Sequence, residues 1–152
     1  MNKKQIKSMV TLLQLFLIGA LFLPAGTIVG DAAGDTALSV FQMINRYAGM
    51  GFSDDALFYM VMACVFPAAI IIFMRVLKER KNFGASVVLC ALYATASACF
   101  YSAAKRKMVD YATMTWLPYI IILISLTSMM LLIFGFFQAA QDGDGKESPK
   151  KE

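Results

Sequence analysis

The stretch 82–104 reads NFGASVVLCALYATASACFYSAA and decides the class of fold. It holds no charged residue, and it is long enough to cross a bilayer as a helix. The hydrocarbon core of a membrane is about 30 Å thick, which a helix of about 20 apolar residues spans. The stretch therefore predicts a transmembrane helix near residues 83–104.

Small residues follow one flank of this helix, in two adjacent rows with a spacing of four. The rows are Cys90, Ala94, Ala98 and Ser102, and Ala91, Thr95, Cys99 and Ala103. The opposite flank is bulky and carries Val88, Leu89, Leu92, Tyr93, Phe100 and Tyr101. Lipid tails are as apolar as leucine, so membrane helices associate through close packing, which small residues allow. We expect this helix to be central in a bundle and to pack through Cys90, Ala91, Ala94, Thr95, Ala98, Cys99 and Ser102.

The composition is that of a membrane protein with little room for a soluble domain. Of 152 residues, 59% are hydrophobic and 16% charged, whereas soluble domains average about 45–50% and about 25%. There is no histidine, so the commonest metal ligand and the usual general base near neutral pH are missing. Cys64, Cys90 and Cys99 lie in hydrophobic stretches without a C-x-x-C pair, which argues against disulfides and thiol redox chemistry. We expect no cofactor and no metal.

Three further apolar runs predict spans near 8–29, 56–77 and 116–137. The first follows three lysines and ends in small residues, which also describes a signal peptide with cleavage near 31–33. Its length favours a retained helix. We expect residues 1–140 to form one transmembrane domain, and 141–152 a disordered cytoplasmic tail, because this tail is polar and glycine-rich.

The connection between the first two spans contains an amphipathic segment at 36–48. Asp35 or Thr36 is a suitable N-cap, and Val40, Phe41, Ile44 and Tyr47 follow helical spacing. The segment is too short to span, so it lies on the membrane surface or caps the bundle. The expected fold is therefore all-α: a polytopic four-transmembrane-helix bundle with a short extracytoplasmic amphipathic helix between the first and second spans.

Basic residues predict the orientation, since Lys and Arg are in excess on the cytoplasmic side. With four spans, ten of them share one side with both termini: Lys3, Lys4, Lys7, Arg75, Lys78, Arg80, Lys81, Lys146, Lys150 and Lys151. Four lie on the other side: Arg46, Lys105, Arg106 and Lys107. We expect both termini in the cytoplasm, with the protein in a plasma membrane of bacterial type.

The sequence shows little chemistry. No Asp, Glu, Lys or Arg lies in the middle of a span, which weighs against a proton-coupled pump. The polar residues inside the spans either bond within the bundle or line a pore; they are Gln14, Thr95, Ser97, Ser125, Thr127 and Ser128. Four acids lie outside, at Asp31, Asp35, Asp54 and Asp55, and the last two suit a helix start.

Three functions remain open. The first is a non-catalytic accessory subunit or regulator that binds other membrane components. The second is an oligomeric transporter or channel for a small solute, and the third an enzyme at the outer surface that uses the aspartates. The expected partners are the lipid bilayer and either another membrane protein or further copies of this chain, and not nucleic acid. The candidate partner surface is Val40, Phe41, Ile44, Arg46, Tyr47, Lys105, Arg106 and Lys107; alternatively, its apolar stripe packs on the protein's own bundle.

Overall fold

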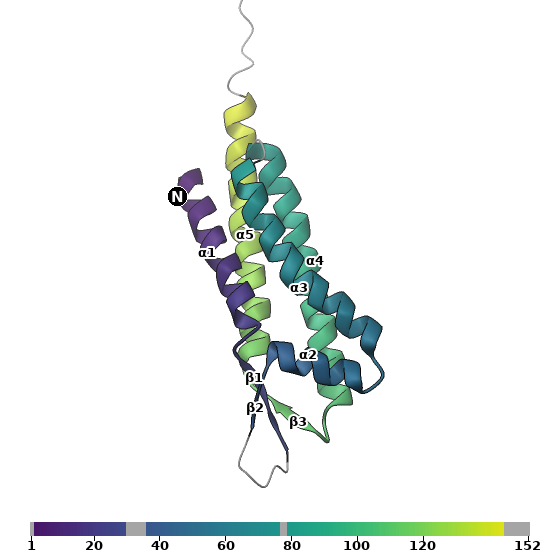
Figure 1. The fold of residues 1–152 in the computed structure, drawn as a ribbon. Coiled ribbons are helices and arrows are strands. Elements are labelled where there is room, and N and C mark those ends of the chain that lie inside the picture. The colour runs from purple at the N-terminus through teal and green to yellow at the C-terminus, as the bar shows by residue number, and fades with distance from the viewer. Residues whose placement is uncertain (1, 30–35, 77–78, 145–152) are drawn as a thin grey trace, which may run out of the picture.

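The computed structural model describes residues 2–29, 36–76 and 79–144 (Figure 1). The described chain is mostly helical and includes one small sheet. In chain order its elements are α1 (Lys3–Ala20), β1 (Pro24–Ile28), β2 (Ala37–Ser39), α2 (Val40–Gly49), α3 (Ser53–Val76), α4 (Glu79–Lys107), β3 (Ala112–Met114) and α5 (Leu117–Asp144).

The four longest helices each pack against two others. α1 contacts α3 and α5, and α4 contacts the same two helices from the other side. α4 is therefore one of four helices that form a ring. Its small residues had suggested instead that it is the central helix of the bundle. The first described residues and the last turn of α5 lie at one end, and the sheet and α2 lie at the other (Figure 1).

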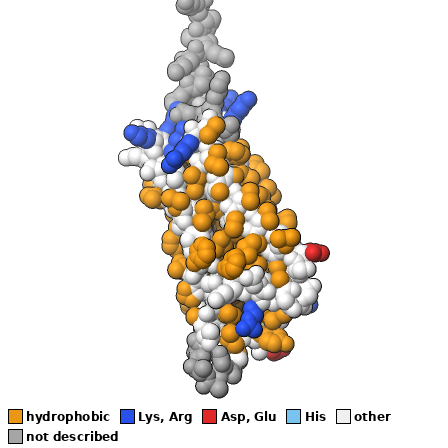
Figure 2. Space-filling model, viewed as in Figure 1, with side chains coloured by type: hydrophobic (Ala, Val, Ile, Leu, Met, Phe, Trp, Pro, Cys, Tyr) orange, Lys and Arg blue, Asp and Glu red, His pale blue; other side chains and the backbone are white. Residues whose placement is uncertain are grey.

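Three of these helices are long and apolar enough to cross a membrane, within Ser53–Val76, Arg80–Lys107 and Leu117–Gln141. They are compatible with the expected integral membrane protein, but three such helices do not confirm the expected four spans. Large apolar side chains are exposed along them, including Leu57, Val88 and Leu123. Figure 2 shows hydrophobic groups over most of the visible face of the bundle, with several basic groups at the end that carries the N-terminus and fewer near the other end.

The expected first span, 8–29, has the wrong bounds. α1 has 18 residues and ends at Ala20, and Pro24–Ile28 is a strand in the three-stranded antiparallel sheet β2-β1-β3. Apolar residues up to Val29 had suggested continued helix, but Pro24 has no backbone N–H with which to continue it. The expectation of an all-α fold therefore missed this sheet.

Gly26 fixes how closely the sheet packs. A Cβ atom at this position would lie 2.9 Å from the Thr113 carbonyl oxygen and 3.1 Å from the Cε of Met43. β1 therefore approaches β3 and α2 as closely as only glycine permits. The Thr27 and Thr113 hydroxyls, 2.6 Å apart, form a cross-strand hydrogen bond on the exposed side.

The helix expected at 36–48 begins later than expected, at Val40. Residues 37–39 pair with β1 as β2, and Ser39 is the N-cap in place of Asp35 or Thr36. The Ser39 hydroxyl accepts from the Gln42 backbone N–H at 3.2 Å, and the Gln42 side chain accepts from the Ser39 N–H at 2.9 Å. This capping box satisfies N–H groups at both positions.

The basic residues lie at the two ends of the helices. Lys3, Lys4 and Lys7 are in the first turns of α1, and Arg75, Arg80 and Lys81 flank the turn between α3 and α4. Arg46 lies in α2, and Lys105, Arg106 and Lys107 form the last turn of α4 at the sheet end. The other basic residues counted from the sequence, Lys78, Lys146, Lys150 and Lys151, lie outside the described residues, as do Asp31 and Asp35. α5 continues to Asp144, beyond the expected start of the tail at 141.

Candidate functional site

The predicted partner surface divides into a buried and an exposed part. Val40, Ile44 and Tyr47 are at most 2% exposed and belong to the main hydrophobic core. They pack on the protein's own bundle, which was the alternative interpretation of the stripe. Phe41 is 41% exposed, and Arg46, Lys105, Arg106 and Lys107 are exposed.

The small flank of α4 is only partly a packing face. Cys90 and Ala94 are buried and Ala91 is half-buried, but Thr95, Ala98, Cys99 and Ser102 are exposed. The buried side of this helix instead carries Phe83, Tyr93, Phe100 and Tyr101. Four of the seven residues predicted to pack are therefore not covered by the described chain. Aromatic rings instead fill space between α4 and its neighbours, as where Tyr59 of α3 stacks on Phe100.

An aromatic cluster connects α2, α3 and α4 near the sheet end. Tyr59 stacks on Phe100 with ring centroids 4.2 Å apart and an interplanar angle of 3°. Phe100 and Tyr47 pack edge to face with ring centroids 5.5 Å apart, and Tyr47 stacks on Phe52 with ring centroids 4.9 Å apart. Such pairs stabilise by about 0.5–1.5 kcal/mol beyond the area that they bury. The cluster thus holds α2 against the two long helices.

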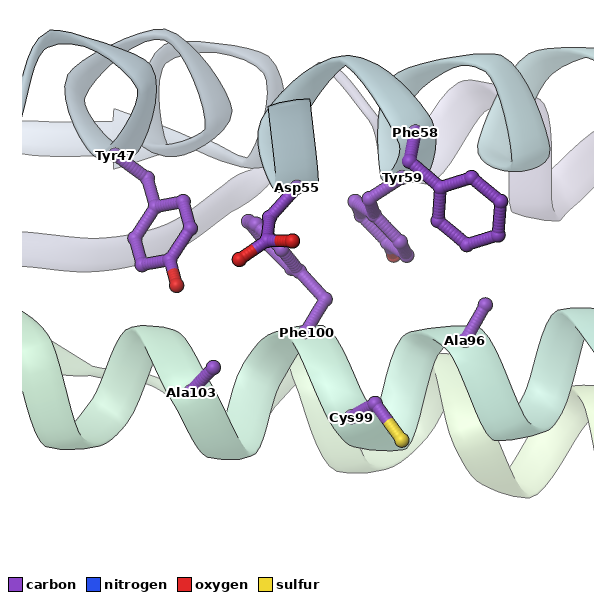
Figure 3. Close-up of a pocket in the computed structure, with 8 residues that line it drawn as sticks. All are labelled: Tyr47, Asp55, Phe58, Tyr59, Ala96, Cys99, Phe100 and Ala103. Carbon is purple, nitrogen blue, oxygen red and sulfur yellow. The ribbon is translucent and has the colours of Figure 1, made fainter. Parts of the chain in front are cut away.

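A pocket of about 270 Å³ lies beside this cluster, between α3 and α4, and we call it the α3–α4 pocket (Figure 3). Its lining comes from α2, α3 and α4: Tyr47, Asp55, Phe58, Tyr59, Ala96, Cys99, Phe100 and Ala103. In Figure 3 the small residues Ala96, Cys99 and Ala103 lie along α4, and the Asp55 carboxylate lies between Tyr47 and Tyr59. The pocket is therefore apolar and aromatic, with one acid.

The electrostatics at this pocket centre on Asp55. Burial raises the pKa of the Tyr47 phenol above its ordinary value, and the nearby Asp55 charge raises it further. The charge of Arg106 opposes this effect. The neutral phenol is thus favoured at this position, and Asp55 and Arg106 both lie close enough to Tyr47 to influence it.

A second feature is a set of buried polar side chains on α1, α4 and α5, which we call the polar column. Six of them are 0% exposed: Gln14, Asn82, Ser86, Ser97, Ser125 and Ser128. Some are bonded inside the bundle, as expected from the sequence. The Ser125 hydroxyl donates to the Ile121 carbonyl at 2.8 Å, and the Ser97 and Tyr59 hydroxyls lie 3.4 Å apart.

Others have no hydrogen-bond partner within the described part of the chain. These buried atoms are Gln14 Oε1, Asn82 Nδ2, Asn82 Oδ1, Ser86 Oγ, Tyr93 OH and Ser128 Oγ. An unpaired buried polar group costs about 1–3 kcal/mol. Hydrogen bonds within the described chain therefore do not explain why these polar atoms are buried. The sequence analysis missed Asn82, Ser86 and Tyr93, although their spacing with Cys90 and Ser97 follows one helical face.

The three cysteines are free thiols, two exposed and one buried. No group of three His, Cys, Asp or Glu side chains among the described residues is arranged to hold a metal ion. Asp54 and Asp55 lie in the first turn of α3, as expected for acids near a helix N-terminus.

The chain was compared with protein-family models, curated proteins and solved structures, and none of them matches it.

Proposed function

We propose that this chain is a non-catalytic integral membrane protein that binds another membrane component in the α3–α4 pocket. The observation that carries the proposal is the position of the pocket. It lies on the flank of two helices that are apolar enough to span a membrane, a few residues from the basic last turn of α4. From Phe100 to Lys105 the helix rises about 8 Å. A component that moves within the bilayer would reach the pocket laterally.

In the proposed topology, α1 is the fourth span and both termini are cytoplasmic. α1 packs on α3 and α5, which are apolar enough to span. Its length of 18 residues corresponds to about 27 Å of helix, close to the hydrocarbon thickness,. The N-terminal end carries Lys3, Lys4 and Lys7, and this basic excess favours the cytoplasmic side. The sheet and α2 then face the outside.

The lining of the pocket suits binding better than catalysis. Its side chains offer one carboxylate, one thiol, two phenols and apolar groups. Ligand sites are mostly apolar with a few polar groups that set orientation. In this proposal the protein is an accessory subunit or a regulator, and the bound membrane component is what it recognises.

The proposal is tested by filling the pocket. Cys99 is exposed and lines the pocket, and Thr95 is exposed one turn away, outside its lining. Cys99→Phe should remove an amphiphile that co-purifies with the wild type in mild detergent, as seen by native mass spectrometry. Thr95→Phe should retain it. Equal retention by both variants and the wild type would show that this pocket binds nothing.

The polar column favours a second function, passage of a small polar solute through the bundle. Unpaired groups such as Gln14 Oε1 and Ser128 Oγ inside a bundle suit a hydrogen-bonding solute,. Purified protein in liposomes should then accelerate entry of a small neutral polyol such as glycerol. Rates equal to those of empty liposomes would exclude this function.

A further inference from the structure

We propose that the α3–α4 pocket recognises the head group of a zwitterionic, amine-bearing phospholipid, with its ammonium against Asp55 and its phosphate beside Arg106. This inference rests on the proposed function and adds the chemical class of the ligand. Asp55 of α3 lines the pocket, aromatic rings lie beside it, and Arg106 of α4 lies outside the lining but close enough to Tyr47 to influence its phenol.

The acid is placed to receive a cation. Asp55 is exposed, lines the pocket and lies between the rings of Tyr47 and Tyr59 (Figure 3). Among the residues that the structure describes, no lysine or arginine forms an ion pair with Asp55. A carboxylate in an otherwise apolar lining sets one orientation for a bound ammonium, which is the role of the few polar groups in such sites.

The rings provide a second source of attraction for an ammonium. Four of the eight lining residues are aromatic: Tyr47, Phe58, Tyr59 and Phe100. A cation within about 6 Å of a ring centroid is attracted by the electron-rich face. The cluster already shows this property at its outer end, where the Lys107 ammonium lies 5.1 Å from the centroid of Phe52, which stacks on Tyr47.

The positive side of the site is on α4. Ala96, Cys99 and Ala103 line the pocket, and Arg106 continues the same row at helical spacing. The Arg106 Nε donates to the Ser102 carbonyl at 3.3 Å, which leaves its terminal nitrogens available within the described chain. Arg106 also lies close enough to Tyr47 for its charge to lower the pKa of that phenol. A phosphate accepts such guanidinium donors well.

The two charges select against the two simpler classes of lipid. A purely anionic head group is attracted by Arg106 but repelled by Asp55. A purely cationic head group is attracted by Asp55 but repelled by Arg106. A phosphate with an attached ammonium complements both. The volume of about 270 Å³ lies just below the range of sites for whole drug-sized molecules, about 300–1,000 Å³. It therefore suits a head group, whose acyl chains continue along the exposed flank that includes Phe58.

The test uses the full chain in mild detergent with an equimolar mixture of phosphatidylethanolamine and phosphatidylglycerol. These lipids share the phosphate and the acyl chains, but only the first carries an ammonium. Native mass spectrometry should show about fivefold greater retention of phosphatidylethanolamine, the effect of about 1 kcal/mol from one exposed charge pair. Asp55→Asn should reduce the ratio to about one, and Asp54→Asn should leave it unchanged, because Asp54 is outside the pocket lining.

A lipid variant keeps the test independent of folding. N-acetyl phosphatidylethanolamine lacks the ammonium and should lose the preference on the wild-type protein. An unchanged ratio in Asp55→Asn, or equal retention of the acetylated lipid, would overturn the inference. A preference for phosphatidylglycerol would overturn it too, since it would assign recognition to the basic residues alone. These results would leave the proposed function standing, because only Cys99→Phe tests whether the pocket binds anything.

Discussion

The Tyr59 hydroxyl donates a hydrogen bond to the Tyr101 hydroxyl at 3.1 Å, and it links α3 to α4 inside the bundle. Both side chains are buried, at 1% and 5% exposure. The same Tyr59 ring stacks on Phe100 and borders the α3–α4 pocket. One residue thus connects the polar interior with the aromatic wall of the pocket, so changes in either region should be felt in the other.

Tyr59→Phe should lower stability mainly through the loss of this bond, because the ring and its stacking remain and the contact with the Ser97 hydroxyl is longer, at 3.4 Å. Hydrogen bonds between membrane helices average about 0.6 kcal/mol, with a maximum of about 1.7. Unfolding in detergent should show a loss in this range. Tyr101→Phe should cost a similar amount, and the double variant little more than either single one, because both remove the same bond. Fully additive losses would contradict this arrangement.

Ala94→Leu should destabilise the protein, whereas Ala98→Leu should be tolerated. Ala94 is 7% exposed on the inward side of α4, so a larger side chain overpacks the bundle at about 1–3 kcal/mol,. Ala98 is exposed at the edge of a groove between α4 and α5. Thermal unfolding of the two variants measures the difference. Equal losses would show that the whole small flank is packed, as its sequence alone had suggested.

The sequence is enough to predict the positions of helices α3, α4 and α5, although α5 runs well beyond its expected end at 137. Charge-free apolar runs of this length have few alternatives in a membrane protein. It is not enough to predict which flank of α4 points inward. Small residues and aromatic residues both make good helix contacts, and the choice depends on what the neighbours supply. Here Tyr59 of α3 supplies a ring for Phe100 and a hydroxyl for Tyr101.

The sheet could not be predicted for a related reason. Residues 24–28 continue an apolar run, and their strand depends on partners at 37–39 and 112–114, far apart in the sequence. The pocket likewise combines Asp55, expected only as a helix-capping acid, with the α4 row that ends at Arg106. The sequence does not show that Asp55 and Arg106 lie near the same pocket, because this depends on the packing of α3 against α4.

Gly135→Ala should destabilise the contact between α4 and α5. A Cβ atom at Gly135 would lie 2.6 Å from a ring carbon of Phe83, which is fully buried, so the ring or one of the helices would have to shift. The expected loss is about 1–3 kcal/mol, as for other overpacked sites. Gly19→Ala is the matched control in α1, since nothing lies within 4 Å of its added carbon. That control should be neutral or stabilising, and a loss equal to that of Gly135→Ala would contradict the prediction.

The proposed topology predicts opposite labelling of two exposed positions. Asn45 lies on α2 and Gln5 on the first turn of α1, at opposite ends of the helices. A membrane-impermeant maleimide added to intact cells should label Asn45→Cys and not Gln5→Cys, with the wild-type chain as background for the native thiols. Cell lysis should expose Gln5→Cys. The reverse pattern would place the termini outside.

The last prediction concerns Gln14, whose side chain is fully buried in the bundle with Oε1 unpaired among the described residues. Its Nε2 donates only to the Cys90 sulfur, at 3.8 Å, and sulfur is a weak acceptor. Gln14→Leu removes an unsatisfied polar group worth about 1–3 kcal/mol and keeps a similar volume. The variant should therefore unfold at a higher temperature than the wild type.

The same variant separates the two proposed functions. If the polar column conducts a small solute, Gln14→Leu should abolish glycerol entry into liposomes while lipid retention in the α3–α4 pocket stays intact. Thr95→Val is the control, because this exposed hydroxyl already donates to the Ala91 carbonyl at 2.9 Å. A Gln14→Leu variant that is less stable than the wild type would show that the glutamine is a structural bond of the bundle, and the case for a solute path would lose its main support.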